Sequence, residues 1–510
     1  MAAWPHVSAL WDISLAERDL RFKAHWQPLR LAIDDALAGH TTKSFDASAA
    51  GFVWSGDIYH AHAGVLSREL VPTQVTLAAP QKLAGAPLRD ASVLARLHAV
   101  ADLAPTATNW QPHRVIVMSE SAAIECGVKL RDADPLALGL LLFRRPRYES
   151  LLGDILDIFG ANATAFEEWV DPGIYVESLR LLAHDASLTL EVIDAAQALP
   201  PPAAALMPGA AIDARHLPFL FLRFRGSPQQ VHAATPLVPL MLSRSSQRVA
   251  SPARALPLAP LQAFTGEQVA WVAADHPAVA AIGRAMFTAL YGRGADPETK
   301  QGGVGGIDLQ PEKAAGHLGV SLDGPVQAAH LGPYLGERFL DRYERRGETL
   351  VSARGEPMTY KHLTRMARTF ASAMGSHFLQ FHNTHPAVGI VLAAPGGEGA
   401  FAAGVLAART LYYARAQGWA AIVKSGPIDL AEAGIAEAIE SAVTPRQRDA
   451  LRAGELRPAL TLQVGWPLAN ERLASGRTGL ELRERDLRPP HAHPLAHFFV
   501  PLASPAHKNA

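Results

Sequence analysis

Apolar residues recur at helical and then at strand-like spacing in the N-terminal half of the chain. The helical pattern from Val93 to Ala101 is followed by a strand-like run at Arg114–Met118. A second helical pattern at Tyr175–His184 is followed by the apolar run Leu217–Leu222. Such periodicities predict helices alternating with buried strands.

The C-terminal part carries a similar succession. Val388–Leu392 has the composition of a buried strand, and Ala400–Gln417 has the pattern of a long helix that Gly418 ends. The apolar run Ala459–Pro467 predicts a closing strand. A glycine after the last apolar position of a helical pattern is a typical stop signal, so the end of this helix is well defined.

These patterns divide the chain into three parts. We expect residues 1–75 to be an N-terminal extension, residues 76–228 a first unit and residues 229–510 a second unit. The second unit is expected to contain a lid-like insertion around residues 263–385, because long insertions between core elements often cover a pocket.

The expected insertion is the least informative part of the sequence. Tyr334–Arg345 and Tyr360–Phe378 have helical patterns, so we expect a largely helical lid. The stretch Gln301–Gly306 is rich in glycine but lacks the lysine and hydroxyl residue of a phosphate-binding P-loop, which favours a plain loop.

Composition narrows the class of protein. The chain has 510 residues, of which 49% are hydrophobic and 19% charged, enough for two or three globular domains. A net charge of −1 argues against nucleic acid or an anionic membrane as partner. The single cysteine, Cys126, excludes an internal disulfide framework, and the charges within Met1–Leu20 are unlike a signal peptide. We therefore expect a cytoplasmic protein that acts on a small molecule.

The turn Ala104–Pro112 joins the first helix to the first strand and is rich in hydroxyl and amide side chains. Asn109 and Gln111 each offer hydrogen-bond donors and an acceptor, which suits the carbonyls and ring nitrogens of a flat heteroaromatic ring. From the residue types alone, an ordinary helix-to-strand turn is the better explanation.

A second candidate element follows the first unit. Arg244 and Arg248 are four residues apart, with Ser246 between them and several prolines after them. Guanidinium groups bind phosphate oxygens in a bidentate manner, and four-residue spacing would place both on one face of a helix. The alternative is a solvated helix end, which such clusters usually are.

Three stretches together resemble one family. Helix, A-P-[ST]-x-x-N-x-Q-P and strand at Ala104–Pro112 resemble the flavin-edge loop of the nitroreductase superfamily. Arg244–Arg248 resembles its R-[ST]-x-R phosphate element. The order of strand, glycine-rich turn at Gly397–Gly399, helix, Gly-Trp, strand and late arginines resembles the second half of a nitroreductase domain. His113 and Ala107 depart from the family pattern, which usually has Trp and Ser at these places.

The resemblance implies an α+β fold with two tandem copies of a mixed central sheet flanked by helices. The first copy has the Asn109 loop without a phosphate element, and the second has the Arg244 element without such a loop. Complementary losses of this kind indicate an internal duplication. The chain is thus expected to form an intramolecular pseudo-dimer, similar in layout to the actinobacterial dormancy-associated tandem proteins.

The resemblance also implies one composite site for FMN. The phosphate would be held by basic and hydroxyl residues, and the ring by the loop and the glycine-rich turn. The implied cofactor-binding residues are Arg244, Ser246, Arg248 and Arg477, with Arg472 as a substitute for Arg477, then Pro105, Thr106, Asn109 and Gln111, and finally Gly397, Glu398 and Gly399.

The implied activity is that of an FMN-dependent oxidoreductase that passes electrons from NADH or NADPH to a small organic acceptor. The flavin carries the electrons, so no catalytic side chain is expected, and the sequence has no recognisable Ser-His-Asp or carboxylate-pair arrangement. A non-catalytic FMN-binding or FMN-sequestering protein and a flavin-free structural relative remain as alternatives. The protein is expected to be a monomer or a homodimer.

Two clusters of histidines raise the alternative of a metal site. His382 and His385, and the group His491, His493 and His497, have spacings that could ligate zinc. The prolines among them indicate irregular loops and no companion carboxylates are evident, so we expect no metal site.

Overall fold

The computed structural model describes most of the expected core. The described residues are 45–47, 52–54, 85–101, 104–105, 114–144, 160–194, 217–226, 250, 255–291, 321–326, 343–346, 349–352, 354–362, 385–424 and 428–466. Within them lie two four-stranded sheets with their helices, and two small two-stranded sheets.

The first four-stranded sheet has the strand order β3-β4-β6-β5, and every neighbouring pair is antiparallel. Its strands are β3 (Arg114–Ser119), β4 (Leu138–Arg144), β5 (Thr189–Asp194) and β6 (Leu217–Arg225). The predicted strands at Arg114–Met118 and Leu217–Leu222 are thereby confirmed.

The two faces of this sheet have different coverings. Alternate residues such as Val117, Leu140 and Leu222 belong to the main hydrophobic core, which includes helices α4 (Ala91–Ala101) and α7 (Gly160–Asp185). The opposite face carries a smaller core cluster with α5 (Glu120–Glu125). This division follows from the two-residue period of side chains along a strand.

The second four-stranded sheet has the order β7-β10-β12-β11, again with antiparallel neighbours. Its strands are β7 (Val269–Ala273), β10 (Ala387–Ala393), β11 (Ala420–Lys424) and β12 (Arg457–Gly465). Its helices are α10 (Ala259–Thr265), which η2 (Gly266–Gln268) joins to β7, then α11 (Pro277–Tyr291), α15 (Gly397–Ala416), α16 (Ile428–Ala438) and α17 (Pro445–Arg452). Every residue of β10 is buried, which is typical of a strand covered on both faces.

The two sheets follow the same plan. In each, the second strand is followed by a long helix, then by an edge strand, and the last strand pairs between them. Each also has an irregularity in the same strand pair, where Phe143 and Leu392 lie opposite Pro218 and Pro458. Proline has no N–H to donate to the ladder, so a shift of register at this place is expected in both. We call the elements from α4 to β6 the first unit and those from α10 to β12 the second unit.

The sheets are antiparallel over the described strands, where the sequence led us to expect mixed sheets. A helical crossover joins two strands that run in the same direction, β4 to β5 and β10 to β11. These strands are not neighbours, because β6 or β12 pairs between them and runs the opposite way. The pattern of helices between strands therefore did not reveal the local pairing.

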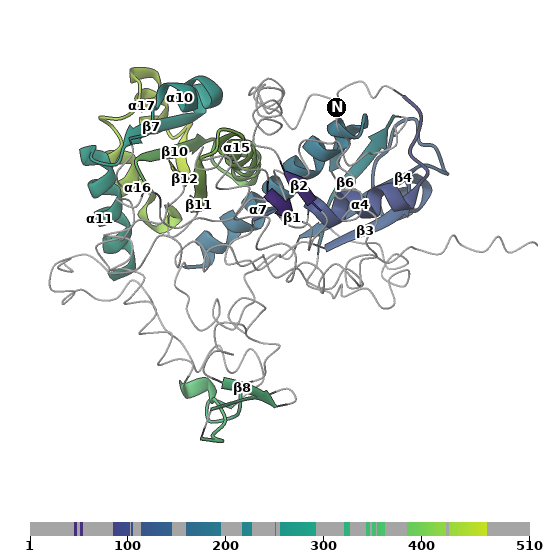
Figure 1. Cartoon of the computed structure of the whole chain (residues 1–510), viewed down its shortest axis with the longest axis horizontal. Coiled ribbons are helices and arrows are strands. Elements are labelled where there is room, and N and C mark those ends of the chain that lie inside the picture. Colours follow the sequence, from purple (N-terminus) through teal and green to yellow (C-terminus); the bar gives the residue numbers. More distant parts are fainter. Residues whose placement is uncertain are drawn as a thin grey trace, which may run out of the picture.

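Helices α7 and α15 pack against each other between the two sheets (Figure 1). The closest approach is at Gly173 and Gly404: a Cβ on Gly173 would overlap the carbonyl oxygen of Phe401, and a Cβ on Gly404 would overlap that of Val170. The contact is reciprocal, so the two backbones meet where neither has a side chain.

Two expected helices need adjustment. Helix α15 begins at Gly397 and not at Ala400. Tyr343–Arg346 is strand β8, paired with β9 (Thr349–Ser352), although a helix was expected there. Backbone pairing with the β-branched and apolar residues of β9 overrides the helical spacing.

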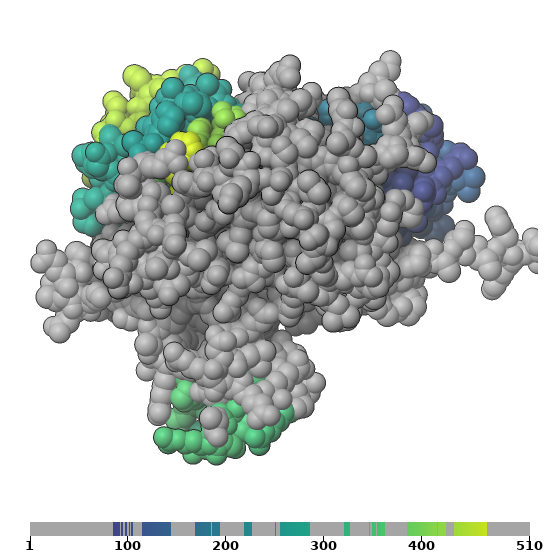
Figure 2. Space-filling view, in the orientation of Figure 1, coloured from purple at the N-terminus to yellow at the C-terminus, as the bar shows by residue number. Residues whose placement is uncertain are grey.

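The expected lid contains core structure at its N-terminal end, because Val269–Ala273 is the edge strand of the second sheet. Figure 2 shows the described surfaces of the two units on opposite sides of the view, with the segment around the β8–β9 hairpin below them. The strands β1 (Phe45–Ala47) and β2 (Phe52–Trp54) form the other small sheet. The division into residues 1–75, 76–228 and 229–510 stays a prediction.

We predict that Gly173→Ala lowers the stability of the protein. The added methyl group would force α7 and α15 apart, at a cost of about 1–3 kcal/mol that exceeds the gain in helix propensity. The shift should be measured as a lower midpoint of urea unfolding.

Gly434→Ala in α16 is the matched control. The nearest atom to its new methyl group would be the Cβ of Ala285 at 3.0 Å, and the position is exposed. Its neighbour is a methyl group and not a backbone oxygen, so this variant should lose clearly less stability than Gly173→Ala. Equal midpoints for Gly173→Ala and wild type would contradict the close backbone contact.

Candidate functional site

The structure describes only part of the expected flavin site. Pro105 and the turn Gly397–Gly399 lie in the described part of the chain. The remaining expected residues lie outside it, namely Thr106, Asn109, Gln111, Arg244, Ser246, Arg248, Arg472 and Arg477. Their assignment to the cofactor therefore stays a prediction.

The glycine-rich turn forms the start of α15. Gly396 precedes the helix with φ 92° and ψ −179°, a conformation that favours glycine, and it provides no side-chain cap. A Cβ on Gly399 would overlap the carbonyl oxygen of Ala394, so this position also requires glycine. These glycines therefore allow the chain to turn sharply after β10 and to enter the long helix α15 directly.

This helix start has the chemistry of a binding site for a carbonyl or an anion. The first N–H groups of a helix have no acceptor within it, and at α15 these belong to Gly397, Glu398 and Gly399. Gly396 and Glu398 are exposed. The positive end of the helix dipole adds to the attraction for negative charge.

Trp169 of the first unit lies directly against this turn of the second unit. A Cβ on Gly397 would overlap the Trp169 indole. The indole makes an edge-to-face contact with Phe219 at 4.9 Å between centroids, and Phe219 makes another with Phe401 at 6.1 Å. The glycine-rich turn is therefore bordered by aromatic side chains from both units.

Pro105 follows the end of α4, where the N–H of Ala104 donates to the carbonyl oxygen of Ala101 at 2.9 Å. Helix α4 packs on α7, and the Nδ1 of His98 lies 2.8 Å from the hydroxyl of Tyr175. The start of the expected ring loop and the glycine-rich turn thus belong to helices that both pack on α7.

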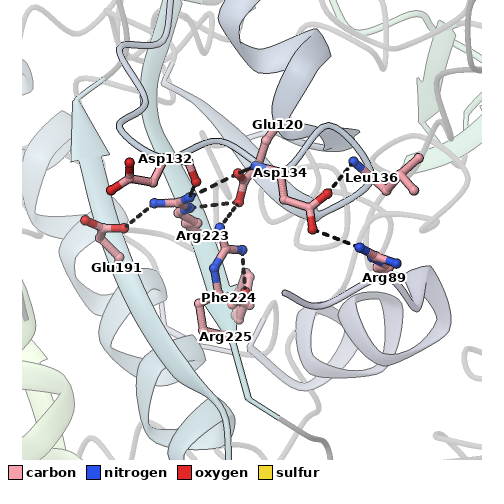
Figure 3. A network of polar contacts seen from close by, with 9 residues as sticks. All are labelled: Arg89, Glu120, Asp132, Asp134, Leu136, Glu191, Arg223, Phe224 and Arg225. Atoms are coloured by element: carbon pink, nitrogen blue, oxygen red, sulfur yellow. Dashed lines mark hydrogen bonds and ion pairs between the residues drawn. The ribbon is translucent and has the colours of Figure 1, made fainter. Parts of the chain in front are cut away.

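A buried polar network that the sequence reading missed lies at the end of the first sheet (Figure 3). The Glu120 carboxylate is fully buried and accepts two hydrogen bonds from Arg223, at 2.8 and 3.1 Å. Arg225 forms an ion pair with the same carboxylate at 2.6 Å. Arg223 also reaches Glu191 at 3.4 Å and donates to the carbonyl oxygen of Asp132 at 2.6 Å.

The same network fixes the loop that covers this end of the sheet. The backbone N–H of Asp134 donates to Glu120 at 2.8 Å, and the Asp134 side chain pairs with Arg89 at 2.9 Å. The hydrogen bond from Arg89 holds the pKa of the Asp134 carboxyl below its ordinary value.

The guanidinium groups of the network are committed to protein partners. Burial opposes the charged form of Arg223, but the hydrogen bond and charge of Glu120 outweigh it and raise the pKa of this guanidinium. We therefore interpret the network as an anchor for the end of β6 and not as a ligand site. Its signal in the sequence is the alternation of Arg223 and Arg225 with Phe224 in an otherwise apolar strand.

Three further features of the described residues concern a thiol nucleophile, a metal site and a membrane span. Burial raises the pKa of the Cys126 thiol, and the charge of Glu125 adds to the effect, so this thiol is a poor nucleophile. No group of three metal-ligating side chains occurs among the described residues. None of the described helices combines the length and apolar character needed to cross a lipid bilayer.

We predict that Glu120→Gln destabilises the first unit by about 3–5 kcal/mol, because it leaves two buried guanidinium groups without their carboxylate. The loss should be seen as a lower urea midpoint. Glu267→Gln is the control, since Glu267 makes only an exposed ion pair with Arg446 at 3.5 Å. A similar small effect for both variants would show that the network contributes little.

The chain has distant structural similarity to proteins of known structure. No protein-family model matches the chain, and no curated protein matches it. The structural neighbours include nitroreductase family proteins. One, from Streptococcus pneumoniae TIGR4, is 14% identical, with a TM-score of 0.22, and the match covers 33% of this chain and 92% of the other. A presumed nitroreductase from Anabaena variabilis ATCC 29413 is 10% identical, with a TM-score of 0.33, over 80% of this chain and 99% of the other.

Proposed function

We propose that the chain is a tandem nitroreductase-like flavoprotein that binds one FMN between its two units and passes electrons from NAD(P)H to a small organic acceptor. The observation that supports it most directly is the position of the Gly397–Gly399 turn of the second unit against Trp169 of the first. A helix start bordered by the other unit is what a composite site requires.

The common plan of the two sheets supports a duplicated origin. Strand order, the long helix after the second strand and the proline-linked irregularity at Pro218 and Pro458 recur in both units. The helices α7 and α15 also end alike, because Ser187 and Gly418 both have left-handed backbones, with φ 59° and 76°. Two similar units that meet through the same helix form an intramolecular pseudo-dimer.

The described groups suit a flavin. FMN has a phosphate and a planar ring whose polar edge carries carbonyl oxygens and ring nitrogens. Backbone N–H groups at this helix start, among them that of the exposed Glu398, are donors that suit such an edge. Aromatic side chains such as Trp169 beside the turn reduce contact with water. When bound, the flavin would supply the electron-transfer chemistry, and the protein would orient it.

The rest of the site follows from the sequence resemblance. In this proposal the phosphate is held by Arg244, Ser246 and Arg248, with Arg477 assisting. The other ring edge is met by the loop from Pro105 through Asn109 to Gln111. The proposal includes a cytoplasmic location, a monomer or homodimer, and neither nucleic acid nor membrane as partner.

A second candidate is a protein that binds or sequesters FMN without turnover. The contact between the Trp169 indole and Gly397 favours it, because a large side chain at the turn leaves less room for a second substrate. The two candidates share the cofactor and differ only in whether an electron donor and acceptor can reach it.

The deciding experiment starts from the protein as purified. A bound oxidised flavin should give a yellow protein that absorbs near ~450 nm and releases FMN on denaturation. Steady-state oxidation of NADPH or NADH is then followed with menadione or a nitrofuran as acceptor. Turnover supports the oxidoreductase, and bound FMN without turnover supports the second candidate. A colourless protein that does not take up added FMN would refute both.

We predict that Arg244→Ala combined with Arg248→Ala strips the cofactor. Each lost charge-assisted bond costs about 1.5–3 kcal/mol, so the affinity for FMN should fall by about 100-fold or more. Fluorescence titration with FMN measures the change. The control is Arg354→Ala combined with Arg446→Ala, which removes two exposed arginines elsewhere. Full flavin occupancy in the first variant would refute the phosphate assignment.

A further inference from the structure

The interface between α7 and α15 carries buried polar contacts as well as close backbone packing. Nε of Arg409 donates to Oε1 of Glu177 at 2.6 Å, and both side chains are buried. Arg180 donates two further hydrogen bonds to this carboxylate, at 2.6 and 2.8 Å. The Oγ of Ser178 lies 2.7 Å from the hydroxyl of Tyr412. Charged and polar side chains of the two units therefore contact each other in the buried part of the interface.

The backbones at this interface are equivalent, so their side chains can be compared position by position. The N–H of Leu188 donates to the carbonyl oxygen of Ala183 and the N–H of Trp419 to that of Ala414, each at 2.8 Å, so the two helices end with the same bond. Matching the helices on these ends also matches Gly173 with Gly404, the two glycines of the close contact.

In this matching the polar side chains are not equivalent. Among the positions that differ in kind, Glu177 corresponds to Ala408, Ser178 to Arg409, Arg180 to Leu411 and Leu181 to Tyr412. The first helix therefore provides the carboxylate, and the second provides the guanidinium that pairs with it. The interface is symmetric in its backbone and asymmetric in its charges.

We propose that the α7–α15 interface is heterotypic: each helix is specific for the other and disfavours a second copy of itself. Two α15 helices packed in this way would place Arg409 opposite Ala408, and burying a guanidinium without a carboxylate is costly. Two α7 helices would place Glu177 opposite Ser178, so the carboxylate would keep Arg180 of its own helix and lose Arg409. The partner that fits each helix is thus the other unit of the chain.

This specificity has a consequence for the site, and that consequence rests on the proposed function. The position in α15 that matches Trp169 of α7 is Ala400. Pairing of unlike units places the Gly397 turn against Trp169, whereas pairing of two second units would place it against Ala400. The Glu177–Arg409 pair therefore selects the arrangement in which the composite site is formed.

The Glu177 carboxylate also acts on a guanidinium of its own helix. Burial opposes the charged form of Arg180, but the hydrogen bond and charge of Glu177 outweigh it and raise the pKa of this guanidinium. The carboxylate faces two guanidinium groups, Arg180 on its own helix and Arg409 on the other. The specificity therefore depends on which helix provides the second guanidinium opposite Glu177.

The test uses the full chain with the Glu177–Arg409 difference between the two helices removed. In the variant Glu177→Ala with Arg409→Ser, each helix carries the residues that its counterpart has at these positions, so pairing of like units between chains is no longer penalised. Wild type and variant are unfolded in urea and refolded at high chain concentration. Size-exclusion chromatography with light scattering then measures the share of species larger than the native form.

We expect the variant to form such species in about tenfold higher proportion than wild type, in line with the coupling between residues in one charge network. The matched control is Glu440→Ala with Arg452→Ser, which removes an exposed ion pair of the same residue types, 2.9 Å apart, away from the interface. The control should refold like wild type.

The single variant Arg409→Ser covers the case in which the double variant does not fold. It removes the buried guanidinium and leaves Glu177 with Arg180, so it should fold and give an intermediate share of larger species. Equal shares for wild type and Arg409→Ser would overturn the proposal. The readout is molecular mass, which does not depend on bound FMN. If the protein proves to bind no flavin, this test of the interface remains valid.

Discussion

The close backbone contact of α7 and α15 is the constraint on which the rest of the structure depends. Gly173 and Gly404 each lie against a carbonyl oxygen of the other helix, and no side chain fits between them. Since α7 belongs to the first unit and α15 to the second, this contact sets how the two sheets lie relative to each other (Figure 1). It also brings the start of α15 beside Trp169. The position of the candidate site is thus a consequence of how two helices cross.

The close packing of α7 and α15 also brings opposite charges near enough to offset the cost of burying a carboxylate. A carboxylate taken out of water is costly unless opposite charges and hydrogen bonds replace its hydration. At the interface the short separation lets Arg409 reach Glu177 across the two units. Within the first unit, Arg223 and Arg225 play the same role for Glu120. In both places one buried carboxylate meets two guanidinium groups, and neither cluster leaves a cation for a ligand.

Much of the local structure could be predicted from the sequence. Periodicity identified α4, β3, β6, β10, β12, the C-terminal part of α7 and most of α15, and Gly418 marked the end of α15. The start of α15 was placed too late because glycines are poor helix formers. In this chain they are required at the first turn, where the backbone has little room for a Cβ, as at Gly399.

The contacts that define the site could not be predicted in the same way. Trp169 reaches Gly397 from a different unit, and Arg223 and Glu120 are 103 positions apart. Such pairs leave no periodic signal, because a pattern within one element says which face is buried but not what covers it. The position of the glycine-rich turn at the start of a helix was predictable. The aromatic border of the turn, the antiparallel pairing and the β8 strand were not.

Comparison of the two units suggests why so much of their backbone is alike while their polar residues differ. Pro218 and Pro458 and the glycines of the crossing are positions where the backbone itself restricts the residue. Arg223, by contrast, pairs with Gly139 in the ladder, and the equivalent Gln463 pairs with Val388, so charge at this position is free to change. Two units with a similar backbone can therefore differ in the tasks of their polar residues. The first unit holds its sheet end with a charge network, and the second presents an open helix start.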